Sequence, residues 1–179
     1  MKWIILSAVS LVCWVALYLY IYLGLSKPVH VELKTSPELV LVFKKHLGAY
    51  HKVNETIEDV ENRFKKEGLQ CPQTFGEYPD DPEKISEDRL VSYVGCVFKE
   101  PAAALKALAK KNDLQYEVRT PRKAIVATFA GSPAVGPMKV YPKIDALIQD
   151  QRLVRSSALM EIYEVQGDHV LTTYLQPVQ

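Results

Sequence analysis

The sequence passes twice through the same order of expected elements, and this duplication limits its possible folds more than any other feature. The first pass gives two strands, a helix and two strands at residues 29–34, 39–46, 51–67, 73–78 and 90–98. The second gives the same order at residues 114–119, 123–130, 140–151, 158–165 and 169–175. An alanine-rich helix at 101–111 connects them. The pattern predicts an α+β domain of two ββαββ halves, about 29–98 and 114–178, related by a pseudo-twofold axis.

Alternation within the strand at residues 73–78 divides its side chains between two faces. Phe75 is the apolar member, so Gly76 and Tyr78 are expected on the face away from the core. A glycine beside an aromatic ring has two interpretations. It forms the floor of a pocket, or it is a notch that lets neighbouring groups pack closely.

The corresponding strand of the second half, residues 158–165, shows the same division. Met160 and Ile162 are apolar, which places Glu161 and Tyr163 on the opposite face. We therefore expect Glu161 and Tyr163 to lie beside the matching pair of the first half.

In residues 90–98 the apolar alternation leaves Tyr93 and Gly95 on that same face. Each helix is expected to cover the apolar face of its own strands, while the remaining faces meet across a groove. These tyrosines and glycines, together with Glu161, would line it. The alternative is an ordinary solvent-facing sheet surface.

The N-terminal segment is apolar. Residues 3–25 contain no charged side chain and would span about 34 Å as a helix. We expect residues 1–26 to form a single-pass transmembrane anchor and 27–179 the domain; a cleaved signal peptide is the alternative. Lys2 and the N-terminal amine favour a cytoplasmic N-terminus, which would make the domain extracytoplasmic, periplasmic in a bacterium. A cytosolic domain is not excluded by so small a charge difference.

Charge and motif content argue against several function classes. Only Lys2 of the 22 basic residues precedes residue 26, so the remaining 21 balance 21 acidic residues. Nucleic-acid binding is therefore not expected, because it needs a basic footprint. No metal-binding spacing, phosphate-cradling glycine loop or nucleophile elbow occurs, so neither metal nor cofactor is expected. Cys71 and Cys96 are free thiols or a disulfide, and the sequence leaves both open.

Three motifs in order resemble the GyrI-like family of small-molecule-binding domains, which includes bacterial effector-binding domains. They are His46-Leu-Gly-Ala-Tyr50, Gly76-Glu-Tyr-Pro-Asp-Asp-Pro82 and Met160-Glu-Ile-Tyr163. The similarity covers roughly residues 29–178, and is greater to a membrane-anchored branch represented in animals by a testis-expressed ER-phagy receptor. The resemblance implies a central ligand groove that includes Tyr50. Many ligand-binding members carry a glutamate four residues before the proline of the last strand, where this chain has Thr173.

The sequence thus predicts a membrane-anchored GyrI-like domain that binds a small, mostly apolar or aromatic ligand. One alternative is a hydrolase of reactive small molecules that uses Glu161, since some GyrI-like proteins are hydrolases; loss of the acid at Thr173 argues against it. Another is a membrane-tethered adaptor for a protein partner. The expected ligand-binding residues are Tyr50, Gly76, Tyr78, Tyr93, Gly95, Glu161, Tyr163 and Thr173.

Overall fold

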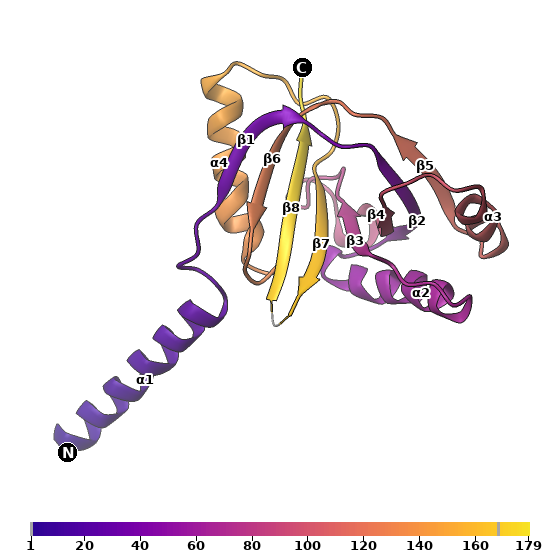
Figure 1. Ribbon diagram of the computed structural model, residues 1–179. Helices are drawn as coiled ribbons and strands as arrows, with labels where there is room; N and C mark the ends of the chain where they lie inside the picture. The colour runs from indigo at the N-terminus through magenta and orange to yellow at the C-terminus, as the bar shows by residue number, and fades with distance from the viewer. Residues whose placement is uncertain (1, 168) are drawn as a thin grey trace.

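The computed structural model describes residues 2–167 and 169–179, apart from the side chains of residues 2, 4–6 and 8. The two ββαββ passes and the connecting helix are all present (Figure 1). In chain order the elements are α1 (Lys2–Tyr22), β1 (His30–Thr35), β2 (Leu39–Leu47), α2 (Val53–Lys66), β3 (Gln73–Glu77), β4 (Val91–Phe98), α3 (Ala103–Lys111), β5 (Gln115–Arg119), β6 (Lys123–Phe129), α4 (Gly136–Asp150), β7 (Met160–Gln166) and β8 (His169–Pro177).

The strands form one eight-stranded sheet in the order β1-β6-β8-β7-β3-β4-β2-β5. The counterparts in the two halves are β1 and β5, β2 and β6, β3 and β7, and β4 and β8. Counterparts lie at equal distances from the two edges of the sheet, so the strand order is symmetric. The centre of symmetry lies between β7 and β3, where the halves join. The first strand of each half pairs with the second strand of the other, β1 with β6 and β5 with β2. The halves are therefore interlocked.

Residues paired across neighbouring strands share a face of the sheet. One continuous row is Val94, Gly76, Glu161, Tyr174 and Ala127. Its first member packs with α2 residues and its last two pack with α4 residues. Both helices therefore lie on the face that carries Gly76 and Glu161, which we call the helix face.

The opposite face, which we call the far face, is also buried. Its central row contains Phe43, Gly95, Phe75, Ile162 and Thr173. A single apolar cluster joins this row to residues of β2, β3, β4, β6, β7 and β8. The sheet is curved (Figure 1), and contact between strands that are not neighbours closes the far face without a helical cover. The expectation that the helices cover the apolar face opposite the groove is therefore wrong.

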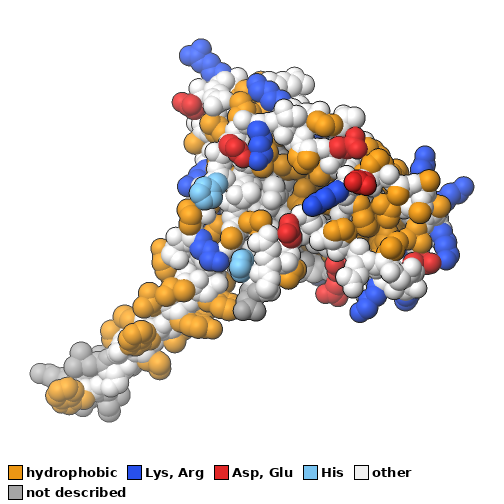
Figure 2. All heavy atoms as spheres, viewed as in Figure 1, with side chains coloured by type: hydrophobic (Ala, Val, Ile, Leu, Met, Phe, Trp, Pro, Cys, Tyr) orange, Lys and Arg blue, Asp and Glu red, His pale blue; other side chains and the backbone are white. Residues whose placement is uncertain are grey.

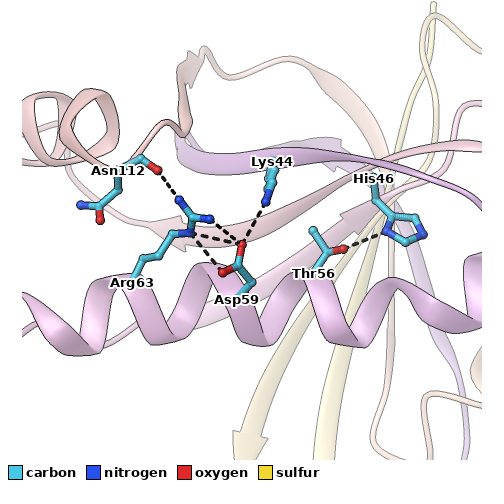
Figure 3. Close-up of polar contacts among 6 residues, drawn as sticks. All are labelled: Lys44, His46, Thr56, Asp59, Arg63 and Asn112. Carbon is cyan, nitrogen blue, oxygen red and sulfur yellow. Dashed lines mark hydrogen bonds and ion pairs between the residues drawn. The ribbon is translucent and has the colours of Figure 1, made fainter.

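Helix α2 is fixed to β2 by polar contacts as well as by its apolar stripe (Figure 3). Asp59 lies 3.0 Å from Lys44 and 3.0 Å from Arg63, which also donates to the carbonyl of Asn112 at 2.7 Å. His46 Nδ1 lies 2.8 Å from Thr56 Oγ1. The guanidinium and ammonium groups hold the pKa of Asp59 below its usual value.

Cys71, which lies just before β3, forms a disulfide with Cys96 on the helix face of β4. Their Cα atoms are 5.3 Å apart, within the range that a disulfide needs. The structure thereby decides between the two alternatives left open by the sequence. The bond lies in the apolar cluster that also includes Phe64 of α2 and Leu105 of α3.

Helix α1 projects from the domain, and its described apolar side chains are exposed (Figures 1 and 2). Among the described residues, no helix is both long and apolar enough to cross a membrane. The anchor expected at residues 3–25 falls in part on side chains outside that description.

The segment that follows α1 is held by Lys139 of α4. The amine of Lys139 lies 2.6 Å from the carbonyl of Leu25 and 2.5 Å from that of Lys27.

Candidate functional site

A groove of about 1070 Å³ lies on the helix face between α2 and α4. One wall comes from the start of α2 and the turn after β3, including Tyr50 and Tyr78. The other comes from the start of α4, including Pro133, Ala134 and Tyr141. The volume lies just above the range usual for small-molecule sites. Because its walls belong to different halves of the repeat, the groove is built at their junction.

Glu161 lies beneath this groove with only 3% of its surface exposed. Tyr141 donates a hydrogen bond to one carboxylate oxygen at 2.6 Å, and Tyr163 donates to the other at 2.8 Å. Burial raises the pKa of Glu161, although both phenol donors oppose that shift. The site therefore contains a buried carboxyl group that can be either protonated or ionised beside the groove.

Tyr78 extends this network toward the first half. Its hydroxyl lies 3.3 Å from that of Tyr163, and its ring makes an edge contact with Tyr50 at 4.9 Å between centroids. Burial raises the pKa of Tyr78 to about 12, so the phenol stays protonated at neutral pH. A Cβ atom added at Gly76 would overlap the Tyr78 hydroxyl. Of the two interpretations of Gly76, the structure supports the packing notch. The Tyr78 side chain, which lines the groove, fills the space beside this glycine.

Tyr50 is positioned by the acidic turn after β3. Its hydroxyl lies 3.0 Å from the carbonyl oxygens of both Asp80 and Val91. The Asp80 carboxylate accepts from the Val91 backbone N–H at 2.7 Å, while Asp81 accepts from that of Glu83 at 3.0 Å. These contacts join the turn to the start of β4. They hold the Tyr50 ring against Tyr78 at the groove wall.

Three residues expected in the groove lie on the far face instead. Tyr93 packs edge-on against Phe43 of the far-face cluster at 5.9 Å between centroids. Gly95 is paired with Phe75, and Thr173 with Ile162, so both belong to the far-face row. Both faces of β4 are buried, so the alternation of its apolar residues does not show which face carries the groove. The expectation that Tyr93 and Gly95 share a face with Gly76 is therefore wrong. Thr173 faces away from this groove, so a glutamate at that position would not contribute an acid to it.

The sequence interpretation missed Tyr141 and Tyr174. Tyr141 lies in the apolar stripe of α4, where its spacing is that of a core residue. Tyr174 is fully buried on β8, and Gly136 of α4 lies directly over its hydroxyl. The hydroxyls of Thr172 and Tyr174 are buried without a hydrogen-bond partner in the described part of the chain. Helix α4 begins at Gly136, four residues earlier than the helix expected at 140–151. Residues 133–137 therefore contribute to the groove wall.

No cluster of three or more His, Cys, Asp or Glu side chains suited to a metal ion occurs among the described residues. The carboxyl group of Glu161 is surrounded by phenols, which are poor partners for a metal compared with carboxylate or imidazole groups. What this arrangement offers chemically is aromatic surface and one buried acid. It suits recognition of an aromatic or cationic group.

Comparison with known proteins finds no matching family model and no matching curated protein. Solved structures do match. The C-terminal domain of EcmrR has a TM-score of 0.60 at 16% identity, covering 84% of this chain and 98% of that one. SAV2435 bound to tetraphenylphosphonium has a TM-score of 0.52 at 16% identity, covering 84% and 94%. A hydrolase encoded by lin2189 from Listeria innocua has a TM-score of 0.57 at 10% identity, covering 83% and 91%.

At these identities the likeness concerns the fold. The eight-stranded α+β architecture agrees with the fold implied by the GyrI-like resemblance, whereas the resemblance to a membrane-anchored branch stays a prediction. The chain thus shares its fold with the C-terminal domain of EcmrR and with SAV2435 bound to tetraphenylphosphonium.

Proposed function

We propose that this protein binds a small, mostly apolar or aromatic molecule in the groove between α2 and α4. The observation that carries the proposal is a cavity of about 1070 Å³ walled by Tyr50, Tyr78 and Tyr141 over the buried acid Glu161. Aromatic rings attract both apolar groups and cations, and a desolvated cation–π contact contributes about 2 kcal/mol. An ionised Glu161 would add charge complementarity to a cation.

The structural neighbours agree with this proposal. SAV2435 is bound to tetraphenylphosphonium, a bulky aromatic cation, and has the same fold as this chain. Tetraphenylphosphonium is therefore a rational first probe for the groove. It combines four aromatic rings with a delocalised positive charge, the two features for which the tyrosines and Glu161 are suited.

Calorimetric titration of the full chain with tetraphenylphosphonium tests the site as well as the binding. We expect saturable binding with a one-to-one stoichiometry. Ala134→Trp, which fills the groove from its α4 wall, should abolish it. Ala146→Trp places the same bulk on an exposed part of α4 and serves as the matched control. Equal binding by both variants would place the probe outside the groove.

A second candidate is a hydrolase of reactive small molecules that uses Glu161. It is favoured by the burial that raises the pKa of Glu161, because a carboxyl group that keeps its proton above the usual glutamate range is better suited to general acid catalysis. A neighbour with this fold is described as a hydrolase. Turnover of a groove ligand that disappears in Glu161→Gln, while binding persists, would favour the enzyme. Unchanged ligand recovered after prolonged incubation would count against it.

We further propose that α1 anchors the domain in a membrane and that the domain faces an extracytoplasmic compartment. The uncharged run at residues 3–25 and the exposed apolar side chains of α1 support the anchor. The Cys71–Cys96 disulfide supports an oxidising compartment, since disulfides rarely persist in the cytosol. Protease added outside intact spheroplasts should digest the domain. Protection until the membrane is permeabilised would overturn the orientation.

A further inference from the structure

A second polar centre lies along the same groove, around Arg155. The backbone of this residue forms a β-bridge with Val178, and the next residue donates its N–H to the carbonyl of Pro177 at 3.0 Å. The guanidinium Nε donates to Gln176 Oε1 at 3.2 Å, and Nη2 pairs with Asp145 of α4. Both the backbone and the head group of Arg155 are thereby positioned.

The amide of Gln176 explains why this arginine is held in place. Gln176 is 1% exposed, and its Nε2 donates to the carbonyls of Ser157 at 2.9 Å and Pro177 at 3.0 Å. With its donors used in this way, its oxygen is directed at Arg155. An arginine fixed by a buried amide loses less conformational entropy on binding a ligand than a mobile surface arginine does.

Ser157 adds a hydrogen-bonding group at the same place. Its hydroxyl oxygen is buried and has no hydrogen-bond partner in the described part of the chain. Ser157 lines the groove and also a neighbouring cavity of about 320 Å³. An unpaired buried hydroxyl is costly unless a ligand or water pairs with it. Arg155 and Ser157 both contact the side-chain amide of Gln176 and both line the groove, so we treat the guanidinium and this hydroxyl as one donor set.

This donor set is separated from the aromatic end of the groove. Tyr141, which binds Glu161, and Asp145, which binds Arg155, are one turn apart on α4, or about 6 Å. Among the described residues, three acidic groups line the groove. The Asp145 carboxylate is paired with Arg155, and that of Asp80 accepts the Val91 N–H. Glu161 accepts from two phenols and has a raised pKa, which reduces its repulsion of an anion.

We propose that the groove takes a bipartite ligand, with an aromatic part among the tyrosines over Glu161 and a carboxylate bound by Arg155 and Ser157. This inference rests on the proposed small-molecule function and specifies the ligand class. A planar carboxylate matches the forked donors of a guanidinium. The ligand would thus be an aromatic acid or an aromatic zwitterion rather than a simple lipophilic cation.

Two dyes that differ at one group test the inference on the full chain. Rhodamine 110 and rhodamine 123 share the same aromatic cation, but the first has a free carboxylate and the second its methyl ester. Fluorescence anisotropy should show rhodamine 110 binding about five-fold more tightly, the size expected for a half-exposed charge pair. Arg155→Met should remove this preference and leave the affinity for rhodamine 123 within about two-fold.

Lys143→Met removes the same charge from an exposed site on α4 outside the groove and should preserve the dye preference. Ser157→Ala, which removes a single hydroxyl, should reduce the preference even if Arg155→Met does not fold. Equal affinities of the two dyes in the unaltered chain, or a preference that survives both Arg155→Met and Ser157→Ala, would overturn the bipartite ligand alone. Absence of binding by either dye would contradict groove binding itself, and this inference with it.

Discussion

Gly76 and Glu161 are directly paired residues of β3 and β7, the two strands at which the halves of the repeat join. Because Gly76 has no side chain, the ring of Tyr78 folds back over it toward the carboxylate network. The buried acid Glu161 and the Tyr78 ring of the groove wall therefore come from different halves. Neither half alone would contain the groove.

Two glycines on opposite faces of the sheet should respond differently to substitution. Gly76→Ala introduces a methyl group that meets the end of the Tyr78 side chain, which can rotate away. At Gly95 the methyl group would lie 2.6 Å from the Phe43 Cα and would also overlap backbone of the adjoining strand. We expect Gly95→Ala to lower the free energy of unfolding by about 3 kcal/mol and Gly76→Ala by less than about 1 kcal/mol.

Urea denaturation measures both stabilities, and calorimetry measures ligand affinity. Gly76→Ala should weaken tetraphenylphosphonium binding although it leaves the fold intact, because Tyr78 is displaced from the groove wall. Similar losses of stability in both variants would contradict the assignment of Gly76 to the groove and Gly95 to the far face.

The sequence predicted the order of elements well, because strand alternation and helical spacing are local signals. Within the helix expected at residues 51–67, Val53, Ile57, Val60 and Phe64 recur at helical spacing and are buried. The opposite orientation of Phe75 and Glu161 was also expected from alternation and is confirmed. These features depend only on neighbouring residues, so a single sequence contains them.

What the sequence did not reveal depends on contacts between distant segments. The exchange of β1 and β5 between the halves leaves no local signal. Both faces of the sheet are buried, so apolar residues alone could not tell which face the helices cover, and Tyr93 was assigned to the groove. The contact of Tyr141 with Glu161 could not be predicted, because a tyrosine in the apolar stripe of α4 fits the helical pattern whether or not its hydroxyl has a function.

Reduction of the Cys71–Cys96 disulfide should destabilise the domain. The bond closes a loop with a sequence separation of 25 residues. A loop of this size corresponds to about 3.5 kcal/mol in the chain-entropy treatment. Urea denaturation with and without a reducing agent measures the difference, and a Cys71→Ser/Cys96→Ser variant should be insensitive to the agent. Unchanged stability on reduction would show that the covalent bond contributes little.

Lys139 should control the order of the segment that follows α1. Its amine contacts the carbonyls of Leu25 and Lys27, and it lies 5.0 Å from the centre of the Phe129 ring. Lys139→Met should therefore increase amide hydrogen exchange at Gly24, Leu25 and Lys27, whose backbone N–H groups are hydrogen-bonded, by about ten-fold, corresponding to a loss near 1.4 kcal/mol. Lys143→Met, with the same charge change on an exposed side of α4, should have no effect there. Equal exchange in both variants would rule out this role for Lys139.

The affinity for a cation should rise with pH through the titration of Glu161. Burial raises the pKa of this group, so in the empty protein it is protonated at pH values where an ordinary glutamate is ionised. A cation favours the ionised form, and binding therefore releases a proton until the pH exceeds the raised pKa. Tetraphenylphosphonium should bind more tightly as the pH increases from about 5 to about 8, whereas neutral triphenylphosphine oxide should not.

Glu161→Gln should flatten this dependence, and Glu164→Gln, on the same strand but partly exposed and hydrogen-bonded to Gln73, should preserve it. The same raised pKa means that the stabilisation from a protonated Glu161 is present at low pH and is lost as the pH rises through that value. A pH-independent affinity in the unaltered protein would show that Glu161 does not contact the ligand charge.

The location of the bound cation can be measured directly with tetraphenylarsonium, because anomalous scattering identifies its arsenic atom in a crystal of the full chain. We expect a single arsenic position between α2 and α4, within about 6 Å of the Tyr78 or Tyr141 ring, the distance over which a cation interacts with an aromatic face. An arsenic peak on the far face beside Tyr93, or along α1 with the groove empty, would contradict the proposal that this groove is the binding site.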